Sequence, residues 1–250
     1  MTPALRLCGL RYAWPGGRRG AGFALAVDEF AMARGERVFL HGPSGSGKST
    51  LLALICGIAA PQAGAVEVEG EALSALSPAR RDRFRAERIG VVFQMFNLLP
   101  YASALDNILL PLRFAPARRA RVAARPGGAR GEALRLTGAL GLPEALAARA
   151  PAAELSVGQQ QRVAVARALI GEPGLIVADE PTSALDAAAQ GAFLDLLFAQ
   201  AAEAGASLLM VSHDPALAAR FDRAVALPDI ARTERGGERH GERHGAGAAA

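Results

Sequence analysis

Cysteine, long apolar runs and an excess of either charge are all scarce in this chain of 250 residues. Its two cysteines, Cys8 and Cys56, are too few and too isolated for a disulfide framework or a metal site, so we expect both to be small buried hydrophobic residues. The longest apolar runs, such as residues 51–60, fall well short of the roughly 18 residues that span a bilayer. The N-terminus also lacks the basic-then-apolar layout of a signal peptide. These absences predict a cytoplasmic protein that does not insert into the membrane.

The charge balance excludes few classes of binding partner. A net charge of +4 and an isoelectric point near 9.8 permit contact with nucleic acid or anionic lipid, but 28 basic residues against 24 acidic ones is a weak excess. The hydrophobic content of 51% is enough for a large core. The chain is therefore expected to be globular, with one large domain or two small ones.

Strand and helix patterns alternate in both end regions of the chain. Residues 1–40 have the pattern of short β segments, and a glycine-rich loop and a helix follow them. This alternation predicts an α/β fold: a mainly parallel sheet with flanking helices and an N-terminal antiparallel β part, with ligand at the carboxyl ends of the parallel strands. The segments expected after residue 40 are a helix at 49–59, an edge strand at 65–70, strands at 88–94, 174–179, 207–213 and 223–227, and a helix at 187–205.

The middle of the chain differs, because its apolar residues repeat with helical spacing on both sides of an Arg/Pro/Gly-rich stretch, residues 113–130. An inserted α-helical subdomain is therefore expected at about residues 95–170. It would belong to a single domain over residues 1–228, whose core is formed by residues 1–94 and 171–228.

The tail, residues 229–250, contains a doubled "GERHGERHG" and is of low complexity, so we expect it to be disordered. His240 and His244 lie in this glycine-rich tail. Two histidines in a flexible segment have no preformed geometry, so no metal site is expected there.

The motif "GPSGSGKST" lies between the Val-Phe-Leu strand and the next helix. A glycine, four residues and then Gly-Lys-Ser, in this strand–loop–helix context, is the pattern of a P-loop. Backbone N–H groups of such a loop surround phosphates, Lys48 reaches the terminal ones, and the Ser49 hydroxyl ligates Mg²⁺. The sequence thus predicts a bound nucleoside triphosphate. The expected binding residues are Gly42, Pro43, Ser44, Gly45, Ser46, Gly47, Lys48, Ser49 and Thr50.

An acidic pair, Asp179 and Glu180, ends another apolar strand. Beside a P-loop, Asp179 can hold Mg²⁺ through water. Glu180 is placed to orient or deprotonate the water that attacks the terminal phosphate. Such a pair is a weak signal alone and becomes a strong one together with the P-loop.

The segment "LSVGQQQRVAVARALI", residues 155–170, is polar at its start and apolar in its second half, which predicts a buried helix. Ser156 is the predicted N-cap, Gln159 stands in the capping-box position, and Gly158 keeps side-chain bulk off the first turn. A helix that begins in this way offers unpaired N–H groups and the positive end of its dipole to an anion.

Together these motifs resemble those of the ATP-binding-cassette (ABC) ATPases, from about residue 5 to residue 228. The resemblance implies a P-loop NTPase core that binds ATP and Mg²⁺ and hydrolyses the ATP. It also implies that Ser156, Gly158 and Gln159 begin the signature helix, which contacts the ATP of a second protomer in a head-to-tail homodimer around two ATPs.

One position departs from the family pattern, because Val157 stands where the signature usually has its first glycine. A β-branched residue is stiffer and bulkier than glycine, so slower hydrolysis or a tighter geometry is expected. Binding is expected to persist, since Ser156 and Gly158 are retained.

The resemblance assigns roles to three further segments. Gln94 matches the glutamine that contacts Mg²⁺ or the attacking water, and residues 183–186, "SALD", match a loop that contacts the opposite protomer. His213 matches the switch histidine, whose side chain would hydrogen-bond the terminal phosphate and keep the water and Glu180 aligned.

An aromatic residue before the P-loop stacks on the adenine in this family. Trp14 stands at the matching place, and a π-face suits any purine. Tyr12 is the alternative, and a plain structural role for Trp14 remains a third possibility.

A single cassette with neither a coiled coil nor a second cassette looks like the separate ATPase subunit of a transporter. Such a subunit would lie on the cytoplasmic face of the inner membrane, bound to integral membrane permease subunits.

Residues 91–112, "VVFQMFNLLPYASALDNILLPL", further resemble the lipoprotein-release, macrolide-export and cell-division subfamily. There this segment helps to form a groove for a cytoplasmic helix of the permease. The candidates for that contact, with core packing as the alternative, are Phe96, Leu98, Leu99 and Tyr101.

The rival function is a soluble ABC ATPase that acts on nucleic acid or on a ribosomal or division complex. It rests on a basic run that comprises Arg113, Arg118, Arg119, Arg121, Arg125 and Arg130. This run has no interleaved aromatic residues for base stacking. A solvated loop or helix face is therefore the expected explanation, and no nucleic-acid partner is expected.

Overall fold

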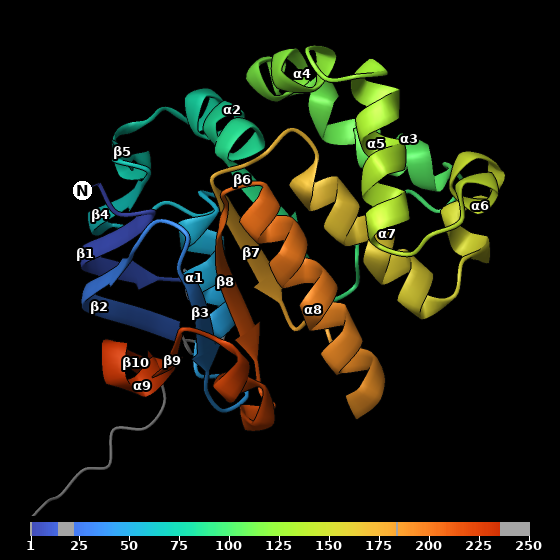
Figure 1. Ribbon diagram of the computed structural model, residues 1–250. Helices are drawn as coiled ribbons and strands as arrows, with labels where there is room; N and C mark the ends of the chain where they lie inside the picture. The colour runs from blue at the N-terminus through green and yellow to red at the C-terminus, as the bar shows by residue number, and fades with distance from the viewer. Residues whose placement is uncertain (1, 15–22, 184, 236–250) are drawn as a thin grey trace, which may run out of the picture.

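Two five-stranded sheets lie side by side in the part of the chain that the computed structural model describes, residues 2–14, 23–183 and 185–235 (Figure 1). One sheet is antiparallel, in the order β10-β2-β1-β4-β5, and the other is parallel, in the order β6-β7-β8-β3-β9. The antiparallel strands are β1 (Leu5–Ala13), β2 (Phe23–Met32), β4 (Ala63–Val68), β5 (Glu71–Ala72) and β10 (Ala231–Arg235). The parallel strands are β3 (Arg37–His41), β6 (Ile89–Val92), β7 (Leu175–Asp179), β8 (Ser207–Ser212) and β9 (Arg223–Ala226).

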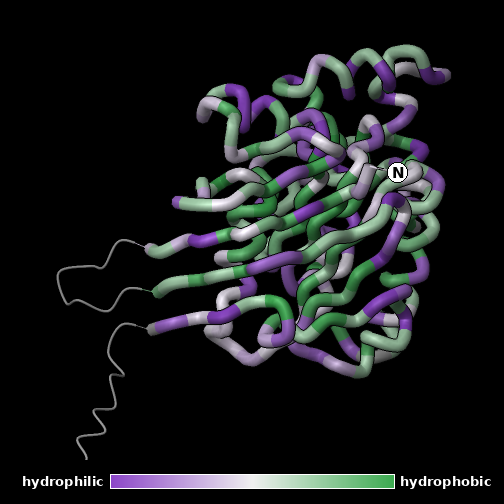
Figure 2. The backbone as a smooth tube through the Cα atoms, turned by 90° about the vertical axis from the view of Figure 1, so that its left-hand side faces the viewer, coloured by the Kyte–Doolittle hydropathy of each residue, from purple (hydrophilic) through white to green (hydrophobic). Residues whose placement is uncertain are grey.

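The parallel sheet is apolar on both faces, because alternate residues of its inner strands enter two different hydrophobic cores. In β3, Phe39 lies in one core, while Val38 and Leu40 lie in the other. The antiparallel sheet and α1 (Lys48–Ile55) cover the second core, and α7 (Val157–Leu169) and α8 (Ala187–Glu203) cover the first. Apolar stretches accordingly run through the middle of the molecule (Figure 2). The α/β fold predicted from the sequence is confirmed.

The chain between β6 and β7 is mainly helical, and its helices gather at one end of the parallel sheet (Figure 1). α7 connects them to the core, since it packs on both α3 and β6. The helices before α7 are α3 (Ala104–Leu109), α4 (Pro116–Ala123), α5 (Gly128–Ala139) and α6 (Glu144–Arg149), with 3₁₀ turns η2 (Leu110–Arg113) and η3 (Ala152–Glu154). The remaining elements are η1 (Leu73–Ala75), α2 (Pro78–Arg88), η4 (Pro215–Arg220) and α9 (Leu227–Ile230). No helix among the described residues is both long and apolar enough to cross a membrane.

Two strands differ from the prediction. β4 is not an edge strand, because β1 and β5 flank it. The predicted disorder from Asp229 onward does not hold for β10, which pairs antiparallel with β2 and is joined to the core by the buried Leu227 and Ala231. The rest of the tail, with His240 and His244, lies outside the described residues.

The two cysteines differ from each other. Cys56 is buried, as predicted, and this burial raises the pKa of its thiol to about 12, so it stays protonated at neutral pH. The prediction for Cys8 is wrong, because its side chain is exposed. Leu5 and Leu7 face the core from β1, so the next residue, Cys8, lies on the opposite face of the strand.

The Arg-rich stretch is not a solvated segment throughout, because Arg118 of α4 is only 2% exposed. Its guanidinium donates to the carbonyl oxygens of Ile170 at 2.7 Å, Ala168 at 2.8 Å and Ala86 at 3.2 Å. Burial lowers the pKa of Arg118 to about 10, which leaves it charged at neutral pH. The charged donors satisfy carbonyls at the end of α7 and in α2, so this side chain holds α4 on the rest of the fold.

Arg121 and Arg125 are also engaged within the protein. Arg121 donates to the carbonyl oxygen of Gly171 at 2.9 Å, and Arg125 pairs with the carboxylates of Glu132 and Glu172. The expectation of a solvated face is therefore wrong for half of the basic run. It holds for the exposed side chains of Arg113, Arg119 and Arg130.

Replacing Arg118 should destabilise the fold. Arg118→Ala is expected to lower the free energy of unfolding by about 3 kcal/mol, because three carbonyl oxygens lose charged donors at once. Denaturation by urea, followed by circular dichroism, measures the change. Arg119→Ala, one residue away and exposed, is the matched control and should unfold like the parent; equal losses in both variants would contradict the role given to Arg118.

Candidate nucleotide-binding site

The predicted site residues gather at the carboxyl edge of the parallel sheet. β3 leads into the P-loop, β7 ends at Asp179, β8 ends beside His213, and Gln94 follows β6. These four strands are neighbours in the order β6-β7-β8-β3, and the register pairs Val92 with Ala178. Because parallel strands end at the same edge of a sheet, segments far apart in the sequence meet here, as predicted.

The P-loop has the geometry of an anion site. Gly47 caps α1 with a φ of +103°, no side chain caps this helix, and a Cβ at Gly47 would lie 2.8 Å from the ring of Phe23. The first N–H groups of α1 therefore have no side-chain acceptor and face the loop. The Ser46 hydroxyl is buried and without a hydrogen-bond partner among the described residues. An uncapped helix start and an orphaned buried hydroxyl together fit a bound phosphate.

Lys48 adds a positive charge to the loop. Its Nζ donates to the carbonyl oxygens of Gly42 at 2.7 Å and Pro43 at 3.0 Å. Within the described part of the chain, no carboxylate forms an ion pair with this ammonium group. Its bonds are to neutral carbonyls, so the charge is free to attract an anion.

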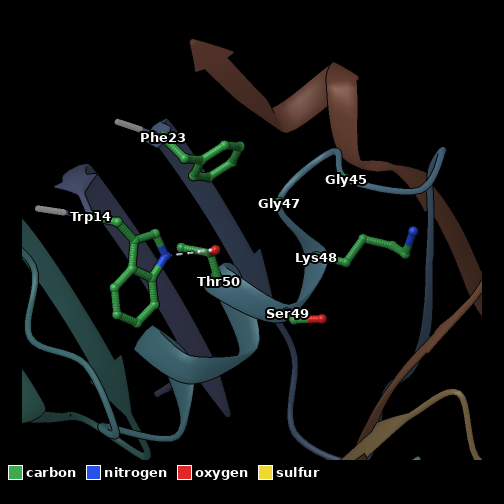
Figure 3. Close-up of a pocket in the computed structure, with 7 residues that line it drawn as sticks. All are labelled: Trp14, Phe23, Gly45, Gly47, Lys48, Ser49 and Thr50. Carbon is green, nitrogen blue, oxygen red and sulfur yellow. Dashed lines mark hydrogen bonds between the residues drawn. The ribbon is translucent and has the colours of Figure 1, made fainter. Parts of the chain in front are cut away.

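An aromatic pocket adjoins the P-loop. A cavity of about 330 Å³ is lined by Trp14 and Phe23 together with loop and α1 residues that include Thr50 (Figure 3). The Trp14 backbone N–H donates to the Phe23 carbonyl oxygen at 2.9 Å, so the residue that follows β1 lies beside the first residue of β2. The Trp14 indole Nε1 donates to the Thr50 hydroxyl at 3.1 Å, and the Tyr12 ring meets it edge-on.

Of the two candidate aromatic residues, Trp14 therefore lines this pocket and Tyr12 does not. Phe23 is a lining residue that the sequence patterns did not single out. No sequence motif pointed to it, because its place beside Trp14 depends on the antiparallel pairing of β1 with β2. Figure 3 shows the two rings on one side of the start of α1 and the Lys48 side chain on the other.

Glu180 is held in a strained conformation by its neighbours. Its φ is +47°, which is unfavourable for a residue with a side chain, and its backbone N–H donates to the Val211 carbonyl oxygen at 2.9 Å. One carboxylate oxygen lies 2.8 Å from His213 Nδ1 and accepts a hydrogen bond from the buried Ser212 hydroxyl at 3.2 Å. The structure thus joins Glu180 to His213, and it adds Ser212, which no sequence motif indicated.

Asp179 lies next to this cluster. Burial raises the pKa of its carboxyl above the ordinary value; the charge of Glu180 raises it further, and the charge of Lys48 opposes the rise. The oxygens of Asp179, the Ser49 hydroxyl and the Gln94 amide are hard donors of the kind that Mg²⁺ prefers. These residues do not form a dedicated cage: among the described residues, no group of three or more His, Cys, Asp or Glu side chains is arranged so that it could hold a metal ion. This set suits an ion that also binds phosphate oxygens.

The capping box at the start of α7 is confirmed. The Ser156 hydroxyl accepts from the Gln159 backbone N–H at 3.3 Å, and the Gln159 side chain accepts from the Ser156 backbone N–H at 2.9 Å. A Cβ at Gly158 would meet no atom within 4 Å, so nothing in the described chain requires glycine there. Val157 points outward and is half exposed. α7 lies apart from α1 (Figure 1), so this helix start does not meet the P-loop of its own chain.

The "SALD" segment, residues 183–186, directly precedes α8. The carboxylate of Asp186 accepts from the Ala189 backbone N–H at 2.8 Å and caps the helix. Ala184 lies outside the described residues. The predicted contact of this segment with an opposite protomer stays a prediction.

The four groove candidates divide between the core and the surface. Phe96 is buried in the first core, Leu98 packs against it, Leu99 is half buried, and Tyr101 is largely exposed. Their segment, Met95–Ser103, is not helical as its spacing had indicated; the first helix after Gln94 is α3.

A groove of about 220 Å³ does lie beside this segment. We call it the arginine-lined groove, and its walls include Ile58, Arg85, Phe93, Asn97, Pro111 and Arg167. The buried Arg118 also lines it, and none of the described lining residues is acidic.

The fold and the site define a P-loop ATPase, and comparison with known proteins specifies the family. A family model described as ABC transporter matches residues 25–183. The chain is 41% identical over 206 residues to the lipoprotein-releasing system ATP-binding protein LolD 1 of Caulobacter vibrioides, covering 80% of this chain and 82% of the relative. It is 40% identical over 199 residues to LolD of Xanthomonas oryzae pv. oryzae, covering 80% and 78% of the two chains.

Solved structures support the same family assignment. The dimeric structure of MJ0796, a bacterial ABC transporter cassette, is similar with a TM-score of 0.75 and 34% identity over 89% of this chain and 93% of that chain. The same values hold for MJ0796 in a post-hydrolysis state bound to ADP and Pi. This chain therefore belongs to the ABC transporter family, as an ATP-binding subunit with ATPase activity.

Removing the Asp179 charge should stabilise the protein in the absence of nucleotide and Mg²⁺. A carboxyl whose pKa is raised by folding contributes stability below its unfolded pKa, and this contribution is lost as pH rises through the folded pKa. Ionised Asp179 is thus unfavourable at neutral pH. Asp179→Asn should melt at a higher temperature than the parent at pH 7.5 in a chelator, and the difference should shrink toward about pH 4. Thermal melts across this pH range test it; a lower melting temperature at pH 7.5 would contradict the assignment.

Proposed function

We propose that this chain binds Mg-ATP, forms a head-to-tail homodimer around two ATPs, and uses hydrolysis to drive an integral membrane permease of the lipoprotein-release type. The observation that carries the proposal is the meeting of the uncapped α1, Lys48, Asp179 and the Glu180–His213 pair at one edge of the sheet. The names of the LolD relatives support the transport class. The cassette would then sit on the cytoplasmic face of the membrane through its permease.

The P-loop binds the phosphates of the nucleotide, and the aromatic pocket binds its base. Backbone N–H groups of the P-loop and of α1, with the Ser46 hydroxyl, donate to the phosphates, and Lys48 exchanges its carbonyl partners for phosphate oxygens. Trp14 stacks on the adenine from the other side of the start of α1. Its bond to Thr50 ties the base pocket to the P-loop.

Glu180 acts on the attacking water. Its carboxylate accepts the proton of that water, while His213 and Ser212 hold the carboxylate in place and His213 reaches the terminal phosphate. Ser49, Gln94 and Asp179 would hold Mg²⁺, which supplies charge stabilisation to the phosphates. The strained φ of Glu180 directs its side chain to this point rather than along the strand.

The start of α7 serves the partner protomer. Glycine inside a helix is less stable than alanine by about 0.5–1 kcal/mol, and the open space at Gly158 shows no internal reason for it. A close approach by the partner's terminal phosphate supplies the reason. Val157 would face the same interface, because its side chain points outward.

The arginine-lined groove would receive the permease. Ile58 is 58% exposed on its wall, and Met95, which is 81% exposed, lies two residues before the lining residue Asn97. Arg85 pairs with Asp82 outside the lining, but the lining itself combines apolar side chains and arginines with no acidic residue, which fits a short amphipathic helix that carries a carboxylate. Such a helix is the kind of cytoplasmic segment that a permease can offer.

Glu180→Gln should separate binding from hydrolysis. The variant keeps the shape and hydrogen bonds of the site but cannot take a proton, so turnover should fall by about 10²-fold to 10⁴-fold. ATP binding and ATP-dependent dimerisation, measured by gel filtration with light scattering, should persist. Near-normal turnover would remove Glu180 from its role.

Lys48 offers an independent check on the P-loop, because it is the only lysine in the sequence. An amine-reactive reagent should therefore modify one side chain, and Mg-ATP should protect it, as peptide mass spectrometry would show. Lys48→Ala should not bind ATP. Labelling that is indifferent to Mg-ATP would place the phosphates elsewhere.

The transport class is tested by capture from membranes. Glu180→Gln, held in Mg-ATP and used to pull partners from detergent-solubilised membranes of the source cells, should recover an integral membrane protein in near-stoichiometric amount. Arg85→Glu in the same background should recover less, because it places a negative charge in the groove. Recovery of ribosomal, repair or chromosomal proteins without a permease would favour the rival function and leave the ATPase chemistry intact.

A further inference from the structure

We propose that Arg167 is a positioning residue for Gln94: its guanidinium holds a strained turn that aims the Gln94 side chain into the nucleotide site. The inference rests on the proposed function, in which Gln94 holds Mg²⁺ or the attacking water. Arg167 lies in the last turn of α7, eleven residues after the N-cap Ser156.

The turn is strained at two consecutive residues. Phe96 has a φ of +58° and Asn97 a φ of +48°, both in the left-handed region. Asparagine tolerates this region, but phenylalanine rarely adopts it. Two such residues in a row persist only where the surroundings hold them.

Arg167 supplies the holding contacts. Its Nη1 donates to the Asn97 carbonyl oxygen at 2.7 Å, and its Nη2 donates to the Phe96 carbonyl oxygen at 2.5 Å. One planar guanidinium thus binds both carbonyls of the turn, which a single ammonium group could not match in geometry. Burial lowers the pKa of Arg167, and no carboxylate pairs with it among the described residues.

The geometry confines Gln94 between two anchored points. Val92, at the end of β6, and Phe96 are both buried in the first core, while Gln94 between them is exposed. With both ends fixed, the conformation of the turn sets the direction of the Gln94 side chain. If the turn relaxed out of the left-handed region, Gln94 would be displaced relative to Asp179 on the neighbouring strand β7.

The same contact joins three working parts of the molecule. Arg167 belongs to the helix whose start is offered to the partner protomer, it binds the turn beside Gln94, and it lines the arginine-lined groove together with Asn97. A segment bound in that groove would therefore contact Arg167 and Asn97 directly. By shifting these two residues, the bound segment can change the position of Gln94.

A double-mutant cycle on ATP hydrolysis tests the proposal. We expect Arg167→Ala to lower kcat by about tenfold or more, since small displacements of a positioned group are costly, and to raise the Mg²⁺ concentration for half-maximal activity. Gln94→Ala should do the same, and the double variant should be no worse than Gln94→Ala alone. Arg167→Lys should recover part of the activity, because one ammonium group can still bind one carbonyl.

Arg162→Ala is the matched control. Arg162 lies on the same helix and donates to a backbone carbonyl, that of Gly141 at 3.1 Å, away from the turn. This variant should keep the parent kcat and Mg²⁺ dependence. Multiplicative losses in the double variant, with an unchanged Mg²⁺ requirement, would show that Arg167 merely stabilises the fold and would overturn the proposal. Absence of hydrolysis in the parent itself would instead overturn the proposed function.

Discussion

The parallel pairing of β8 between β7 and β3 is the constraint on which the rest of the molecule depends. It brings the end of β7, the end of β8 and the P-loop to one edge, although the P-loop precedes both strands by more than a hundred residues of chain. The backbone hydrogen bonds of the ladder leave no freedom in this placement. The Glu180 backbone extends the constraint, because its N–H bonds to Val211 of β8 beyond the end of its own strand.

Burial of charge gives the site its reactivity. Asp179 is carried into a desolvated place where its ionised form is unfavourable, and the hydrogen bonds of Lys48 go to neutral carbonyls rather than to a carboxylate. Each of these groups is less stable alone than it would be in the presence of phosphate or a divalent cation. The site therefore stores part of the free energy that binding releases, at some cost to the stability of the free protein.

Arginine bonded to backbone carbonyl is the recurring device that joins the helical part to the sheet. Arg118 binds the carbonyls that end α7, and Arg167 binds the turn that follows β6. A guanidinium stays charged when buried and has donors enough for two or three carbonyls, which a lysine could not satisfy in the same geometry. Both side chains border one groove, so the device that assembles the fold also surrounds its predicted docking surface.

The sequence by itself determined the class of the molecule and most of its phosphate chemistry. Local motifs such as residues 42–50 and the Asp179–Glu180 pair need only their own spacing and an adjoining strand, so they could be read without coordinates. Element types in the sheet followed for the same reason, since alternation of apolar residues between two cores is a local pattern.

Only the tertiary structure decided the remaining features. α2 has no buried residues and therefore no apolar period to read, and β10 is ordered only because β2 offers it a pairing edge. Arg118 was expected to be solvated because its acceptors lie some fifty residues away, at the end of α7. Cys8 was expected to be buried because the sequence does not show which face of β1 packs against the core. Contacts between residues far apart in the sequence produce no local sequence pattern. The roles of Phe23, Ser212 and Arg167 could therefore be recognised only in the folded structure.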